Sequence, residues 1–216
     1  FCLDGPSLAR DEMAVAPIIA RFMPNPAPHR VEILAFANAQ ILDVTGPAQV
    51  FATANDLTPT NAPKPYEIAI VSFDAEVTTS SGIVLRSEPL PEDAGTFGAL
   101  IVSGGYGVNV ASRDVALLAW VRRRAATHWQ RWEEFGRRFP KVRLDPDPIF
   151  VRDGPIWTSA GITAGIDLAL AMVELDNGRS LALTVARQLV VFLKRPGGQA
   201  QFSATLALQD TDGTFD

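Results

Sequence analysis

Cysteine is nearly absent from this sequence of 216 residues, because it occurs once, at Cys2. A single cysteine excludes an internal disulfide framework and is typical of a protein that works in a reducing compartment. We therefore expect a cytoplasmic protein. Histidine is almost as scarce, with only His29 and His128, which argues against a histidine-rich metal site. We predict neither a metal nor a cofactor.

An excess of positive charge and a long apolar run are also lacking. Lysine and arginine number 19 against 24 acidic residues, a formal net charge of −5. Such a chain has no basic nucleic-acid footprint. No apolar run approaches the roughly 18 residues that a transmembrane helix needs. Residues 13–20 are apolar but contain Pro17 and have no basic lead-in, so we predict neither a signal peptide nor a membrane partner.

The chain does have enough apolar residues for one sizeable core, since 47% are hydrophobic and 20% are charged. Residues 1–30 are poorly patterned and rich in proline towards their end, and we interpret them as a tail. Continuous apolar runs at residues 31–36, 66–72 and from residue 99 to Gly104 predict buried parallel strands. Together they favour an open α/β sheet.

Hairpins and helices are predicted between and after these strands. Residues 76–85 form a hairpin turned at Ser80-Ser-Gly82, and residues 149–157 form another turned at Asp153-Gly154. Helices are expected to open at Gly46-Pro47, to begin near Ser112 as N-cap, to end at Asn177-Gly178 and to cover residues 181–193.

The stretch at residues 156–174 is the centre of the pattern, because it combines a strand, a tight turn and an apolar helix. Gly161 and Gly165 allow the chain to turn sharply and the helix to pack close to the strands. Such turns lie at the carboxyl edge of an α/β sheet, where these folds bind ligands.

Two further features should meet at this edge. Asp43 follows the first strand and precedes a helix, so it is either a site residue or a helix-capping or turn aspartate. Gly104 and Gly105 follow a buried strand and leave backbone N–H groups that can face an anion or a developing oxyanion. The alternative is that they only form a turn, and their spacing is not that of a dinucleotide-binding or phosphate-binding loop.

One segment breaks the alternation. Helix-like sequence runs from residue 114 to residue 139 with no strand in it, which is longer than most globular helices. We infer that residues are missing at Ala125-Ala126.

Four motifs, in this order, resemble the ThiJ/PfpI branch of the class I glutamine-amidotransferase-like superfamily. They are Gly104-Gly105, Thr127-His-Trp129, Trp157-Thr-Ser-Ala-Gly161 and the helix at residues 167–173. Leu42-Asp-Val-Thr-Gly-Pro47 is similar to isonitrile hydratase and to the sensor domains of GlxA-type AraC-family regulators, and Arg195-Pro-Gly-Gly-Gln-Ala-Gln-Phe202 narrows the resemblance to the regulators.

This resemblance implies a doubly wound, mostly parallel sheet flanked by helices, a flavodoxin-like sandwich, over residues 31–208. Residues 209–216 would then begin a linker to a helix-turn-helix domain that is absent from this sequence. The ligand pocket that it implies includes Asp43, Gly46, Gly104, Gly105, Tyr106, His128, Ser159 and Gly161.

The resemblance also implies a cysteine at a strand-to-helix elbow, and that strand, elbow and helix are missing between Arg124 and Thr127. Either the unit exists in the molecule and is not in this sequence, or it has been deleted. Cys2, in the predicted tail, does not replace the cysteine.

Three functions follow as hypotheses. The first, which we favour, is a ligand-sensing, non-catalytic domain of a regulator that binds a small-molecule effector, forms a homodimer and reaches DNA only through the absent domain. The second is a cysteine-dependent enzyme of the isonitrile hydratase or amidase type. The third is a dimerisation scaffold without a ligand.

Overall fold

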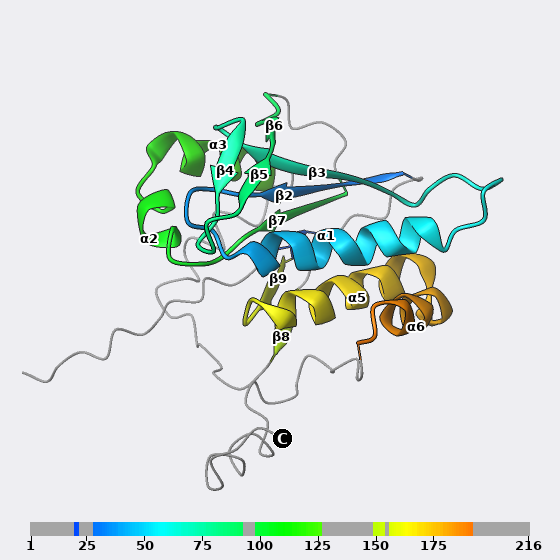
Figure 1. Ribbon diagram of the computed structural model, residues 1–216. Helices are drawn as coiled ribbons and strands as arrows, with labels where there is room; N and C mark the ends of the chain where they lie inside the picture. Colours follow the sequence, from blue (N-terminus) through cyan, green and yellow to red (C-terminus); the bar gives the residue numbers. More distant parts are fainter. Residues whose placement is uncertain (1–19, 22–27, 93–97, 127–148, 154–155, 192–216) are drawn as a thin grey trace, which may run out of the picture.

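The structure is a computed structural model that describes residues 20–21, 28–92, 98–126, 149–153 and 156–191. A seven-stranded sheet, in the order β6-β3-β2-β7-β1-β9-β8, lies at its centre, and β4 and β5 form a separate two-stranded sheet (Figure 1). The strands are β1 Ala20–Arg21, β2 His29–Leu34, β3 Tyr66–Ser72, β4 Glu76–Thr78, β5 Val84–Arg86, β6 Glu88–Pro89, β7 Ala99–Val102, β8 Phe150–Asp153 and β9 Ile156–Ser159. The helices are α1 Ile41–Asp56, α2 Val108–Ala111, α3 Val115–Ala126, α5 Thr163–Asn177 and α6 Arg179–Gln188.

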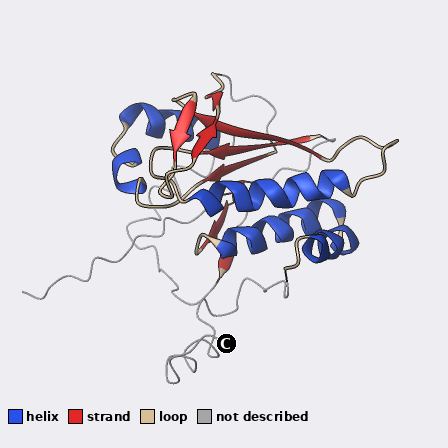
Figure 2. Ribbon diagram, in the orientation of Figure 1, coloured by secondary structure: helices blue, strands red, loops and turns tan. Residues whose placement is uncertain are grey.

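Most strands of the large sheet run in one direction. β2 pairs in parallel with β3 and β7, and β3 pairs in parallel with β6. β7 and β9 are both antiparallel to β1 and therefore run the same way as each other, while β8 is antiparallel to β9. The predicted α/β fold with a mostly parallel sheet flanked by helices is confirmed (Figure 2).

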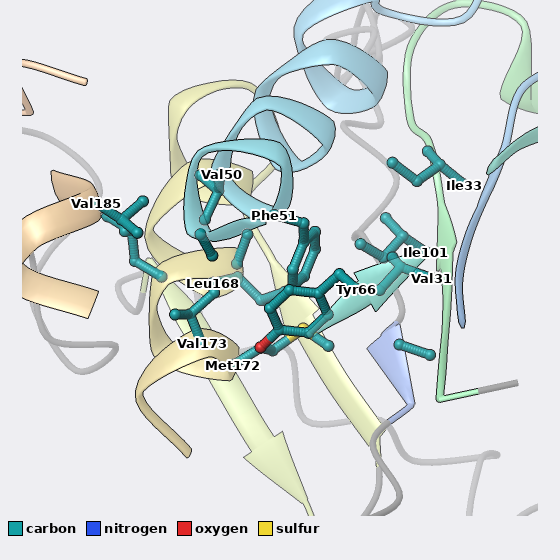
Figure 3. Packing of buried hydrophobic residues seen from close by; sticks show 14 of the residues in the cluster. Val31, Ile33, Val50, Phe51, Tyr66, Ile101, Leu168, Met172, Val173 and Val185 are labelled. Carbon is teal, nitrogen blue, oxygen red and sulfur yellow. The ribbon is translucent and has the colours of Figure 1, made fainter. Parts of the chain in front are cut away.

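Alternate residues of the central strands pack on opposite faces of the sheet, which explains why these strands are apolar throughout. Val31 and Ile33 face a core shared with α1, α5 and α6 (Figure 3). Leu34 faces a second, smaller core that includes Leu117 and Trp120 of α3. Fully burying one side chain of this size contributes about 1.5–3 kcal/mol, so the sheet is stabilised from both sides.

Strand β1 was not predicted, because its two residues lie in the segment interpreted as a tail and are too few to show a pattern. Ala20 pairs with Ile101 of β7 and with Trp157 of β9. The strand that the family resemblance implies after α3 would lie beside β7, since crossover connections usually return to a neighbouring position. In this structure β1 occupies that position.

The boundaries of three helices differ from the predictions. α1 begins at Ile41, and Pro47 lies inside it, so Gly46-Pro47 does not open the helix. The first turn instead forms against the rest of the fold, where the Gln40 N–H donates to the Gly104 carbonyl at 2.9 Å. A sequence pattern does not reveal such a tertiary anchor.

The predicted N-cap Ser112 is instead the C-cap of α2. Asp114 caps the next helix, because its Oδ1 accepts the N–H groups of Ala116 and Leu117 at 2.9 and 3.1 Å. The last predicted helix, residues 181–193, is α6, which begins directly after Gly178 and ends at Gln188. Val190 has a positive φ of 54° and does not continue it.

The hairpins and the helix stop are as predicted. β4 pairs with β5 around Gly82, β8 pairs with β9, and Gly178 ends α5 with a φ of 85°. Cys2, residues 127–148 and the segment at residues 195–202 lie outside the described residues. The predicted continuation of the helix beyond Ala126 therefore stays a prediction.

Candidate ligand site at the carboxyl edge

Asp43 is the centre of the candidate site. It lies in the first turn of α1 and is 0% exposed. Its Oδ2 accepts the Gly104 N–H at 2.9 Å, and its Oδ1 accepts the Ile162 N–H in a short hydrogen bond. One carboxylate thus ties the loops that follow β7 and β9 to α1. Burial raises the pKa of Asp43, and the two N–H bonds act in the opposite direction.

These two hydrogen bonds show which helix Asp43 caps. Gln40, the N-cap of α1, makes no side-chain capping bond, and Ile162 is the N-cap residue of α5. Asp43 therefore bonds the backbone at the start of a helix that is distant in sequence, rather than the start of its own. Both carboxylate oxygens are engaged, so the side chain organises the edge and does not stand free as a base.

In the glycine loop after β7, the Gly104 N–H donates to the Asp43 side chain. Gly105 has a φ of +113°, and a Cβ placed there would lie 2.4 Å from the Gln40 nitrogen. Only glycine fits this contact. Among the described residues the Gly105 N–H donates no hydrogen bond, so it is a candidate donor to a ligand.

The turn between β9 and α5 is tight and strained. Ser159 is buried, and its Oγ accepts the Gly161 N–H at 3.1 Å. Gly161 has a φ of 80°, and Ile162 follows with φ 51° and ψ −119°. Positive φ is a genuine outlier for a β-branched residue, and its cost is typically about 1–3 kcal/mol. The bond from Ile162 to Asp43 helps to hold this conformation.

The three remaining predicted site residues, Gly46, Tyr106 and His128, differ in their surroundings. Gly46 lets α1 and α5 approach closely, because a Cβ there would lie 3.0 Å from Ile166 Cγ1. Tyr106 follows the glycine pair but is 72% exposed, so it lies at the surface of the edge. His128 lies outside the described residues.

Two residues at this edge were missed from the sequence. A Cβ on Gly107 would lie 2.0 Å from the Ala37 carbonyl oxygen, and a third glycine so close to Gly104 was a usable signal. Ile162 gave no signal, because local propensity disfavours its conformation and tertiary contacts impose it. Ile162 and Leu42 are 39% and 42% exposed, so the surface around Asp43 presents apolar side chains.

A shallow depression of about 360 Å³ lies elsewhere, beside the edge of the sheet. Ala48, Ile68, Ala69, Ile70, Arg86, Ser87 and Glu88 line it. None of the predicted site residues belongs to it, so this hollow and the polar groups of the loops do not coincide. We assign the candidate site to the loops, because backbone donors, close glycine contacts and a buried carboxylate converge there.

The described part of the chain has no group of three or more His, Cys, Asp or Glu side chains that could hold a metal ion. No helix within that same part is long and apolar enough to cross a membrane.

The fold is that of the ThiJ/PfpI and DJ-1 proteins. A ThiJ/PfpI family protein from Pseudomonas syringae superposes with a TM-score of 0.59 and 16% identity, covering 96% of this chain and 92% of that one. An AraC family transcriptional regulator structure from Pseudomonas putida superposes with a TM-score of 0.56 and 22% identity, covering 75% of this chain and 99% of that one.

Comparison of the sequence with known proteins finds both an enzyme and transcriptional regulators among its relatives. The chain is 29% identical to isonitrile hydratase of Pseudomonas putida over 190 residues, which are 74% of this chain and 77% of that enzyme. It is 40% identical to the HTH-type transcriptional regulator ArgR of Pseudomonas aeruginosa over 132 residues, 61% of this chain and 38% of the regulator. No family profile matches the chain. The predicted resemblance to ThiJ/PfpI-like sensor domains of AraC-family regulators is confirmed.

Proposed function

We propose that this chain is the ligand-sensing and dimerisation domain of an AraC-family transcriptional regulator. The observation that carries the proposal is the 40% identity to ArgR, which covers only 38% of that regulator, as one domain of a longer protein would. A second regulator, CdhR of Pseudomonas aeruginosa, is 39% identical over 74 residues and is covered to 22%. DNA binding would belong to a helix-turn-helix domain beyond this sequence.

The acidic charge of the chain supports the assignment of DNA binding to a separate domain. A net charge of −5 does not favour contact with a polyanion, so the DNA-binding half should be basic. The sensor would act by binding its effector more tightly in one dimer geometry than in another, because a ligand shifts an equilibrium only by its differential affinity for the two states.

The carboxyl edge is the proposed effector site. It would comprise Asp43 and Gly46 of α1, Gly104, Gly105 and Tyr106 of the loop after β7, and Ser159 and Gly161 at the turn after β9. His128 stays a predicted member outside the described residues. Asp43 would position the loops, and the Gly105 N–H would donate to the ligand. The exposed Leu42 and Ile162 favour an effector with one polar acceptor and an apolar part.

The alternative is a cysteine-dependent enzyme of the isonitrile hydratase type, and the 190-residue match to that enzyme favours it. Such catalysis needs a thiolate nucleophile beside an activating group. The only cysteine, Cys2, lies outside the described residues, and Asp43 already accepts two backbone hydrogen bonds. The sensor is therefore the better-supported function.

Thermal unfolding in the presence of small amides and isonitriles separates the functions. A ligand at a hundred times its dissociation constant adds about 2.7 kcal/mol to the free energy of unfolding. Saturable stabilisation without turnover is expected for a sensor. Turnover of an isonitrile would establish the enzyme, and neither effect with any compound would favour the scaffold.

A further inference from the structure

A second polar cluster lies at the other end of α5, at the amino edge of the sheet. The Tyr66 hydroxyl donates to Asp176 Oδ2 at 2.8 Å and accepts from Asn177 Nδ2 at 2.8 Å. Tyr66 is 3% exposed, and its ring meets Phe51 edge-on at 4.7 Å between centroids. Its hydroxyl faces the last turn of α5 (Figure 3).

The backbone of Tyr66 is held as firmly as its side chain. Asn55 Nδ2 donates to the Tyr66 carbonyl at 2.8 Å, and the Tyr66 N–H donates to Asn55 Oδ1 at 2.9 Å. Asn55 belongs to the last turn of α1. Tyr66 is therefore the point where α1, β3 and α5 are joined.

Asp176 is the titratable member of this cluster. Its Oδ2 accepts from Tyr66, but its Oδ1 is buried and has no hydrogen-bond partner among the described residues. An ionised oxygen in this position loses its hydration without compensation. Burial raises the pKa of Asp176 to about 6, although the bond from Tyr66 and the charge of His29 favour ionisation.

Several other charged or titratable groups lie on the elements around Asp176. His29 begins β2, and its ring centroid lies 6.1 Å from that of Tyr66. Arg179 of α6 pairs with Glu174 at 3.6 Å, and Asp56 and Lys64, at the end of α1 and before β3, are exposed. Of these groups only His29 affects the pKa of Asp176, together with Tyr66.

We propose that Tyr66, Asp176 and Asn177 form a pH-sensitive latch between the end of α5 and β3, which stabilises the folded chain most when Asp176 is protonated and less when it ionises. This latch needs no effector and goes beyond the proposed sensing function. In the protonated state Oδ1 carries the proton, Oδ2 still accepts from Tyr66, and the partly buried Asp176 carboxyl group bears no charge. Ionisation strengthens the hydrogen bond from Tyr66, but it also leaves the buried Oδ1 charged and without a donor among the described residues. The cost of this unpartnered charge is the larger of the two effects.

The sign of the effect follows from linkage. Because the folded-state pKa lies above that of the unfolded chain, the folded protein binds the proton more tightly. The stabilisation is complete below the unfolded pKa of about 4. It is lost as the pH rises through the folded value of about 6.

Carbon-13 NMR of the aspartate carboxyl groups tests the latch directly in the full chain. The Asp176 resonance should titrate near pH 6, and titration near the ordinary value of about 4 would overturn the proposal. Urea unfolding supplies the second readout. Between about pH 4.5 and about pH 7.5, the wild type should lose more stability than Asp176→Asn, whose neutral amide does not titrate.

Glu174→Gln is the matched control, since it removes one carboxylate from the same end of α5 without touching the latch. It should keep the wild-type pH dependence of stability, and the proposal fails if Asp176→Asn keeps it as well. If Asp176→Asn does not fold, Tyr66→Phe decides. Loss of the hydroxyl donor should move the Asp176 titration to higher pH, and an unmoved titration would contradict the latch.

Discussion

An aspartate lies at each end of α5, the buried Asp43 at its start and the partly buried Asp176 in its last turn. The two sites differ in the groups that donate to the carboxyl oxygens. At the carboxyl edge both oxygens of Asp43 accept backbone N–H groups. At the amino edge one oxygen of Asp176 accepts a side-chain hydroxyl and the other has no partner among the described residues. Burial raises the pKa at both sites. The first site therefore fixes loops, whereas the second is built to respond to protons.

The largest effect is expected where the carboxyl edge allows no side chain at all. Gly105→Ala places a Cβ 2.4 Å from the Gln40 nitrogen at a φ of +113°. Backbone must move, and we expect a loss of about 3–5 kcal/mol in the free energy of unfolding, measured by urea denaturation. Gly82→Ala is the control, because Gly82 has a φ of +82° but a methyl group added there would have no neighbouring atom within 4 Å. It should cost only about 1–2 kcal/mol, and equal losses would show that crowding is not the cause.

Removal of the Asp43 carboxylate should be the next largest effect. Asp43→Ala leaves the buried Gly104 N–H and the partly buried Ile162 N–H without their acceptor. Each unsatisfied group costs about 1–3 kcal/mol, so we expect a loss of about 2–5 kcal/mol in the unfolding free energy. Asp114→Ala, which removes an exposed helix cap, should cost about 1 kcal/mol. A loss from Asp43→Ala no larger than that control would mean that the tie between the loops is unimportant.

The smallest effect should have the opposite sign. Ile162→Gly releases a strained backbone conformation, which is worth about 1–3 kcal/mol, but it loses part of a side chain that is 39% exposed. We expect a net stabilisation of about 1 kcal/mol in thermal unfolding. Ile162→Ala is the matched control. It keeps a side chain at the positive φ of residue 162 and should lower the free energy of unfolding. A glycine variant less stable than the alanine variant would refute strain at this turn.

Elements whose signals are local were predicted well from the sequence. β3 has the predicted bounds because its apolar run is closed by polar residues, and Gly82 and Gly178 turn the chain where expected. β1 could not be predicted, since two residues carry no periodicity. The start of α1 was misplaced because Gly104 anchors it from a distant part of the sequence, and this contact outweighs the preference of Pro47 for a first turn.

The candidate site shows the same difference between local signals, which the sequence carries, and tertiary contacts, which it does not. Asp43, Gly104 and Gly161 were expected at one edge of the sheet, and the structure brings their loops together. Their partners were not predictable: Asp43 accepts the backbone N–H groups of Gly104 and Ile162, and Ile162 adopts a conformation that its own propensity disfavours. At the amino edge, Tyr66 and Asp176 are 110 positions apart and show no common motif.

An NMR titration of the nitrogen-15-labelled chain tests the account most directly, with benzamide and cyclohexyl isocyanide as the probes. Binding at the carboxyl edge predicts saturable shifts of the Gly104, Gly105 and Gly161 amides, while the Tyr66 and Asp176 amides stay unchanged. Shifts confined to Ile68 and Ile70, beside the shallow depression, or to the amino edge would contradict the proposed site. The absence of any saturable shift with both probes would count against sensing of this class of ligand.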